Sequence, residues 1–126
     1  MLNSIKKIFT QKTDYKKLKK EISPVPSRFI KDLIDSINLG LIDKTDNLLS
    51  DLSSGEIANI IEQLDSDDRK KLIFFLGSKI EPEIILELDK DIRNEIVSIV
   101  GENTFLDIVS KLDTDDLIFI LEDVEE

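Results

Sequence analysis

Residues 64–91 read LDSDDRKKLIFFLGSKIEPEIILELDKD, and this segment gives the clearest indication of the fold. It opens with Leu-Asp-Ser-Asp at Leu64 and closes with Leu-Asp-Lys-Asp at Leu88, two copies of the frame Leu-Asp-X-Asp. A third copy, Leu-Asp-Thr-Asp, follows after the same interval, at Leu112. Self-similarity at a fixed period is typical of repeat architectures, so the chain is predicted to consist of repeated units.

Half of this interval, a 12-residue period, governs the aliphatic positions. Each unit ends at an aliphatic anchor, and aliphatic residues also stand three and four positions before it. The anchors are Leu52, Leu64, Leu76, Leu88, Val100, Leu112 and Val124; three before them stand Leu49, Ile61, Ile73, Ile85, Val97, Val109 and Leu121; four before them stand Leu48, Ile60, Leu72, Ile84, Ile96, Ile108 and Ile120. These three offsets share one face of an α-helix, so each unit is predicted to be a short amphipathic helix followed by a tight turn.

Helices this short are not stable alone, and they are expected to stack on their neighbours. The predicted fold is an all-α superhelical solenoid of short helices, with a 12-residue repeat and a 24-residue helix pair as the unit. Helices are expected near residues 48, 60, 72, 84, 96, 108 and 120, with no strand.

Residues at the unit boundaries support this interpretation. Asp65 and Asp113 are expected to be helix N-caps, because each has another Asp three residues later, at capping-box spacing. Pro82 suits the first turn of a helix, where its missing N–H does no harm. Gly77 and Gly101 are separated by the interval of the Leu-Asp-X-Asp frames, which predicts that alternate turns differ.

Upstream of the repeat the chain changes character. Residues 27–126 are predicted to form the helical domain, whose first helix carries Phe29, Ile30, Leu33, Ile34 and Ile37 and ends by Gly40. Residues 1–26 are predicted to be a basic leader and a linker, because Pro24 and Pro26 break any helix there.

The leader is amphipathic and strongly basic. Residues 1–22 hold seven Lys against Asp14 and Glu21, a net charge of +5, while residues 23–126 hold 10 basic and 25 acidic residues, a net charge of −15. Leu2, Ile5, Ile8 and Phe9 fall on one helical face. Two interpretations stay open: a solvated, partly disordered extension, or a segment that lies on an anionic membrane surface with its lysines at the head groups.

Composition excludes several function classes. The chain has 126 residues, one domain's worth, with no Cys and no His, so thiolate or imidazole metal ligands and Cys or His catalysis are excluded. It shows no Gly-rich phosphate loop and no nucleophile elbow, and no enzymatic activity is expected. The acidic body disfavours nucleic acid. No apolar run approaches the length of a membrane span, and a cytoplasmic location is expected.

Many carboxylates cluster where helices are predicted to begin: Asp65, Asp67, Asp68, Asp89, Asp91, Asp113, Asp115 and Asp116. One interpretation is helix capping and a favourable interaction with the helix dipole. The other is a ladder of carboxylates that recruits divalent cations, since Mg²⁺ prefers oxygen ligands and often takes only one or two carboxylates.

The segment Leu52–Lys71 resembles the cytosolic N-terminal domain of MgtE-type magnesium transporters. That family's opening motif, His-Pro-X-Asp-Ile-Ala-X-Leu-Leu-Glu-X-Leu, here reads Ser-Ser-Gly-Glu-Ile-Ala-Asn-Ile-Ile-Glu-Gln-Leu from Ser53 to Leu64. The later Leu-Asp-Thr-Asp-Asp-Leu from Leu112 is similar to the family's closing helix. The resemblance extends over about residues 28–126.

The resemblance implies a right-handed superhelix that docks on a pair of CBS domains when Mg²⁺ is plentiful and so favours a closed transmembrane pore. The matching Mg²⁺-contact positions are Glu83 and Asp115, while a third family acid is replaced by Phe119 and the His-Pro pair is missing. This chain carries neither CBS domains nor a pore. The implied role is a Mg²⁺-responsive regulatory module at the inner face of the membrane, with no transport by this chain itself.

An alternative stays open. The helical repeats of flagellar motor switch proteins of the FliG type have a similar cadence, and they work by protein–protein contact without a metal. That family's charged torque helix has no counterpart in the last predicted helix, since Asp116 to Glu126 holds only acids among its charged residues.

Overall fold

A computed structural model describes residues 25–123, and within this range the chain is all-helical, with no strand. The elements are α2 (Ser27–Asn38), α3 (Ile42–Ser50), α4 (Ser54–Gln63), α5 (Ser66–Leu76), the 3-10 helix η1 (Gly77–Lys79), α6 (Pro82–Glu87), α7 (Lys90–Val100), α8 (Glu102–Val109) and α9 (Thr114–Asp123). The all-α prediction is confirmed, and every position at which the 12-residue period predicts a helix falls within one. The predictions for residues 1–22 lie outside the described residues.

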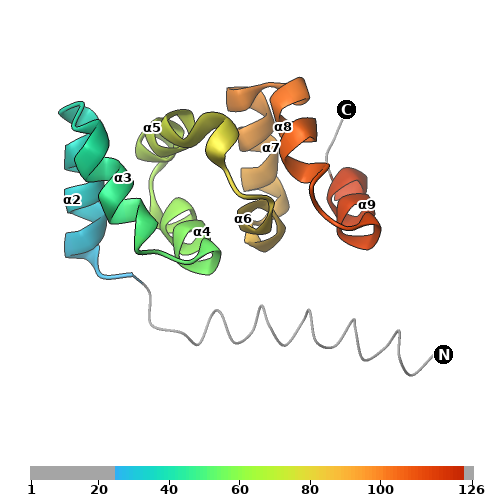
Figure 1. Cartoon of the computed structure of the whole chain (residues 1–126), viewed down its shortest axis with the longest axis horizontal. Helices are drawn as coiled ribbons and strands as arrows, with labels where there is room; N and C mark the ends of the chain where they lie inside the picture. Colours follow the sequence, from blue (N-terminus) through green and yellow to red (C-terminus); the bar gives the residue numbers. More distant parts are fainter. Residues whose placement is uncertain (1–24, 124–126) are drawn as a thin grey trace.

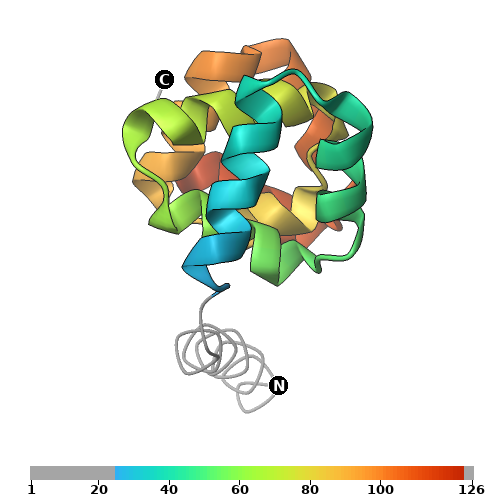
Figure 2. The same cartoon turned by 90° about the vertical axis from the view of Figure 1, so that its left-hand side faces the viewer.

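The helices follow one another along the long axis of the molecule, from α2 at one end to α9 at the other (Figure 1). Several helices pack on helices that do not directly follow them in the chain: α2 packs on α5 and α5 on α7, while α4 packs on α6 and α6 on α8. Seen from the end, α2 lies across the front of the molecule with α3 beside it (Figure 2). This arrangement buries one face of each short helix against helices from other units. The superhelical solenoid itself stays a prediction.

The aliphatic rows identified in the sequence form the core. In the row four residues before each anchor, Ile60, Leu72, Ile84, Ile96, Ile108 and Ile120 are all at most 2% exposed. The row three before each anchor is also buried in α4, α5 and α6, but Leu121 in α9 is 43% exposed. The core is therefore continuous along the molecule and is most open at α9.

Side-chain caps fix several helix starts. Ser53 and Glu56 form a reciprocal capping box at the start of α4. Asp65 Oδ1 accepts from the Asp68 N–H at 2.9 Å, and Asp113 Oδ1 accepts from the Asp116 N–H at 3.0 Å, as their spacing predicts. The remaining copy of the frame behaves differently, because Asp89 occupies the N-cap of α7 without a capping bond from its side chain.

Two glycines make the turns unequal. Gly77 (φ +50°) is the C-cap of α5 and the first residue of η1, and the short helix α6 then begins at Pro82. Gly101 (φ +91°) ends α7 and is also the N-cap of α8, so these two helices follow each other directly. A positive φ favours glycine, which explains its presence at both turns.

Candidate functional site

One series of exposed carboxylates follows the 24-residue period. Asp43, Asp67, Asp91 and Asp115 are the second residues of α3, α5, α7 and α9, and all four are exposed. At this position a carboxylate is stabilised by the positive end of the helix dipole. Asp115, one of the two predicted metal ligands, therefore shares its local setting with three other residues.

The second predicted ligand, Glu83, lies on a different kind of helix. It is the second residue of α6, directly after Pro82, and it is exposed. Among residues 25–123, no three His, Cys, Asp or Glu residues gather closely enough to hold a metal ion. An ion at Glu83 or Asp115 would therefore take its remaining oxygens from water or from a partner, which Mg²⁺ tolerates. The metal prediction stays a prediction.

Arg69 joins three helices. From α5, its Nε donates to the Ile61 carbonyl and its Nη2 to the Leu64 carbonyl, both at 2.9 Å, at the C-terminal end of α4. Its Nη1 donates to both carboxylate oxygens of Glu95 on α7, at 3.1 and 3.2 Å. The guanidinium thus satisfies carbonyls that the end of α4 leaves open, and it ties them to α7.

Arg93 holds the equivalent position one 24-residue unit later, on α7. It is 2% exposed, and its Cζ lies 5.4 Å from the centre of the Phe119 ring on α9. This distance is within the range of a cation–π interaction. Phe119, which replaces the third acid of the family pattern, therefore packs on a buried cation.

Neither arginine contact follows from the aliphatic and acidic patterns of the sequence. The signal was present, because the 24-residue interval that separates Arg69 from Arg93 also separates their partners, Glu95 and Phe119. The repeated arginines therefore indicate both contacts, although the second partner, Phe119, is uncharged.

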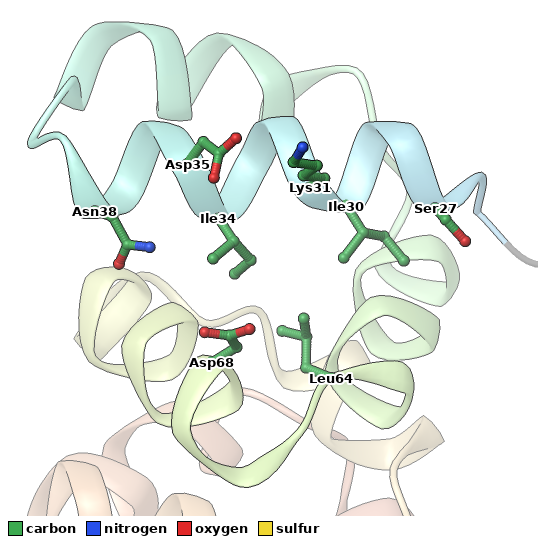
Figure 3. A pocket seen from close by; sticks show the side chains of 8 residues that line it. All are labelled: Ser27, Ile30, Lys31, Ile34, Asp35, Asn38, Leu64 and Asp68. Atoms are coloured by element: carbon green, nitrogen blue, oxygen red, sulfur yellow. The ribbon is translucent and has the colours of Figure 1, made fainter.

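A groove of about 410 Å³ lies between α2 and the start of α5. Ile30 and Ile34 of α2 point across it toward Leu64, and Asp35 and Asp68 stand on its opposite walls (Figure 3). Ser27, Lys31 and Asn38 complete the lining. Three of the eight lining residues are aliphatic and five are polar or charged, so the groove is mostly polar.

None of the helices in residues 25–123 has the length and apolar character needed to cross a bilayer.

Comparison with known proteins gives one result. The family model described as "MgtE intracellular N domain" matches residues 43–126, about two thirds of the chain. The match begins in α3, so α2 precedes it, although α2 packs on both α3 and α5. Searches of curated proteins and of solved structures found no match. The family is a domain family of magnesium transporters and not an enzyme family. The resemblance carried by the motifs is therefore confirmed, and the chain belongs to the MgtE intracellular N domain family.

Proposed function

We propose that this chain is a Mg²⁺-responsive cytoplasmic regulatory module that acts with an MgtE-like transporter. The observation that carries the proposal is the family match over residues 43–126. The charge of the domain supports it, since residues 23–126 carry 25 acidic against 10 basic residues. Carboxylates on such a surface repel another acidic surface until cations screen them.

In this proposal the structural unit is the 24-residue helix pair of a superhelical solenoid, and the partners are the CBS domains and the pore of the transporter. Glu83 and Asp115 supply one or two oxygens to each bridging ion, and the CBS domains and water supply the others. Because each half-site is incomplete, the isolated domain is expected to bind Mg²⁺ only in the millimolar range, worth roughly −4 kcal/mol.

A titration of the full chain with Mg²⁺, followed by backbone NMR at constant ionic strength, tests this. The shifts are expected to saturate and to centre on the first turns of α6 and α9. Glu83→Gln with Asp115→Asn removes two charges and should abolish the saturable shifts. The matched control is Asp43→Asn with Asp91→Asn, which removes two exposed carboxylates at the same helix position and should respond like the unchanged protein.

Equal responses from the two double variants would mean that Mg²⁺ merely screens the acidic surface. The metal-independent scaffold of the FliG type predicts no saturable response in any variant, so the same titration separates the two functions. Phe119→Asp restores the third acid of the family pattern and should strengthen binding. The gain is expected to be small, because Arg93 lies beside that position and competes for the new carboxylate.

We further propose that residues 1–22 bind an anionic membrane surface. The support is their net charge of +5 and their apolar residues Leu2, Ile5, Ile8 and Phe9. The full chain should co-sediment with vesicles that contain phosphatidylserine and not with neutral phosphatidylcholine vesicles.

A chain that lacks residues 1–22 should lose this vesicle binding while its melting temperature stays nearly unchanged. The reason is that Val25 remains in place on α4 through the hydrogen bond from its N–H to Asn59 Oδ1 (3.3 Å). A large fall in melting temperature would instead place the leader in the core.

A further inference from the structure

Four helices carry corresponding stripes of side chains, which are exposed except for the half-buried Asn94 and Glu95 on α7. Each stripe takes the second residue of a helix and the residues three, four and seven positions after it, which share one helical face. The stripes are Asp43, Asp46, Asn47 and Ser50 on α3; Asp67, Lys70, Lys71 and Phe74 on α5; Asp91, Asn94, Glu95 and Ser98 on α7; and Asp115, Ile118, Phe119 and Glu122 on α9. The α3 and α7 stripes are polar throughout. The α5 and α9 stripes both contain large apolar residues.

The α5 stripe places an aromatic ring in solvent among lysines. Phe74 is 79% exposed, the largest fraction among the exposed large apolar residues of the described range, and α3 and α7 have Ser at its position. Lys70 and Lys71, one turn earlier, are exposed. Lys71 Nζ lies 3.8 Å from Asp68, but an exposed pair of this kind contributes little and leaves the lysine available to a partner.

The α9 stripe has the opposite charge. Ile118 is 49% exposed and Phe119 38% exposed, where α7 has Asn94 and Glu95. Every charged residue from Asp113 to Glu126 is an acid. Scattered exposed apolar residues are common on proteins. Here, however, the exposed apolar residues of the α5 and α9 stripes lie at positions that recur every 24 residues. The charged residues beside them are lysines on α5 and acids on α9.

We propose that the α5 stripe of one copy of this chain binds the α9 stripe of a second copy. In an antiparallel alignment, helical spacing sets Phe74 opposite Ile118 and Phe119, and the Lys70–Lys71 turn opposite Glu122. Pairing α5 with α5 would oppose lysines, and pairing α9 with α9 would oppose acids, so the contact between unlike stripes is the favoured one.

The contact is small, and the association is therefore weak. A single pair of short helices buries far less than a stable dimer needs, so a Kd between about 100 μM and 1 mM is expected. Sedimentation velocity of the full chain over a concentration series that reaches this range should show a mass that rises above the 14.4 kDa of one chain. Salt should weaken the association, because its charged part is exposed.

Two charge-reversed variants test the pairing itself. Variant A is Lys70→Glu with Lys71→Glu, and variant B is Asp115→Lys with Glu122→Lys. Each alone should stay monomeric, while an equimolar mixture should associate, because B keeps the lysine stripe and A keeps the acidic stripe.

The apolar part of the contact is tested separately. Phe74→Ser, which introduces the residue that α3 and α7 have at this position, should reduce self-association at least tenfold. Leu39→Ser, at a 72% exposed residue in the α2–α3 turn, should not change it.

The proposal is overturned if the unchanged chain stays monomeric throughout, or if variant A or B associates alone as strongly as the unchanged chain. It is also overturned if the mixture of A and B stays monomeric. Vesicles that contain phosphatidylserine test the alternative partner, a lipid surface. If the chain is monomeric and Phe74→Ser abolishes its vesicle binding, the α5 stripe binds lipid instead of a second copy. Circular dichroism of each variant confirms the helical fold, which surface substitutions at these exposed positions should retain.

Discussion

The Arg69 contact and the Arg93 contact occupy the same place in successive units and are made of different chemistry. Arg69 reaches from α5 to two carbonyls of α4 and to the carboxylate of Glu95 on α7. Arg93 reaches from α7 to the ring of Phe119 on α9. In both, the partner follows the arginine at the same distance along the chain. The repeat thus preserves where a cation lies between helices and allows its partner to change from a charge to a ring.

The same position in the neighbouring units extends the comparison. Thr45 holds it one 24-residue unit before Arg69 and is fully buried; its hydroxyl shares a 2.7 Å hydrogen bond with Ser36 of α2. One unit after Arg93 the position is Leu117, which is half-buried. From α3 to α9 this position therefore holds a hydroxyl, two guanidiniums and an aliphatic side chain. The backbone arrangement accommodates these different side chains, because the buried aliphatic rows supply most of the core.

The largest effect on stability is expected in the buried aliphatic core. Ile84 lies in the buried aliphatic row that runs from α4 to α9 and is 2% exposed. Ile84→Asp places an unpaired charge there and should lower the free energy of unfolding by more than about 4 kcal/mol, enough to unfold the domain. Circular dichroism during urea unfolding measures this. Leu39→Asp, at a 72% exposed residue, is the control and should change little. A cooperative transition at the original midpoint for Ile84→Asp would show that the row is not buried.

The next largest loss of stability is expected when the Arg69 contact is removed. Arg69→Ala leaves the Ile61 and Leu64 carbonyls without their donor and Glu95 without its partner. The two carbonyls belong to buried residues and Glu95 is half-buried, so a loss of about 2–4 kcal/mol is expected. Lys70→Ala, at the adjacent exposed residue, should cost less than about 0.5 kcal/mol. Equal midpoints for these two variants in urea would contradict the structural role given to Arg69.

A smaller effect distinguishes the chemistry of the two contacts. Phe119→Leu keeps an apolar side chain over Arg93 and removes the ring, at an expected cost of about 0.5–2 kcal/mol. Its counterpart, Glu95→Gln, removes the charge from the Arg69 contact and should cost about 1–2 kcal/mol. In 1 M NaCl, where the Debye length is about 3 Å, the Glu95→Gln cost should shrink because that pair is partly exposed. The Phe119→Leu cost should stay the same, since Arg93 is buried.

The opposite salt dependence of these two variants would contradict the chemistry assigned to the two arginine contacts. If salt weakened the effect of Phe119→Leu and left that of Glu95→Gln unchanged, the Arg93 contact would depend on an exposed charge and not on the ring. Phe119→Glu, which rebuilds the partner of the Arg69 contact, should make the second contact as salt-sensitive as the first.

Most of this fold is predictable from the sequence because one physical requirement repeats. Short helices must bury one face, so the aliphatic rows recur with the 12-residue period, and the structure buries most of them. Leu121 departs because it lies on α9, the last helix described, where no later helix of the described range covers it. Helix starts are equally predictable where a short polar side chain reaches its own backbone, as Asp65 and Asp113 do.

Contacts between units are less predictable, because they depend on how far one helix is rotated against another. The aliphatic period gives no sign that Arg69 reaches the carbonyls of α4, or that Arg93 lies under Phe119. The candidate metal site has the same limit. The sequence places Glu83 and Asp115 in the first turns of α6 and α9, and the structure agrees, but ligands from a partner lie outside any pattern in this chain.

The smallest effect compares two caps at equivalent positions. Asp65 caps α5, which packs on both α2 and α7, and Asp113 caps α9, the last helix described. An N-cap Asp replaced by Ala typically costs about 1 kcal/mol. Asp65→Ala should lower the global free energy of unfolding by about this amount, because α5 cannot unfold without exposing the core it shares with its neighbours.

For Asp113→Ala most of the cost should stay local. A terminal helix can open without the rest of the domain, so the variant should speed amide hydrogen exchange in α9 while the urea midpoint hardly moves. Asp65→Ala should instead raise exchange throughout the slowest amides of α4, α5 and α7. If Asp113→Ala shifted the urea midpoint as much as Asp65→Ala does, α9 would unfold together with the rest of the domain. The contact between Arg93 and Phe119 would then couple the last helix to the core as firmly as the Arg69 contact couples α5 to α7.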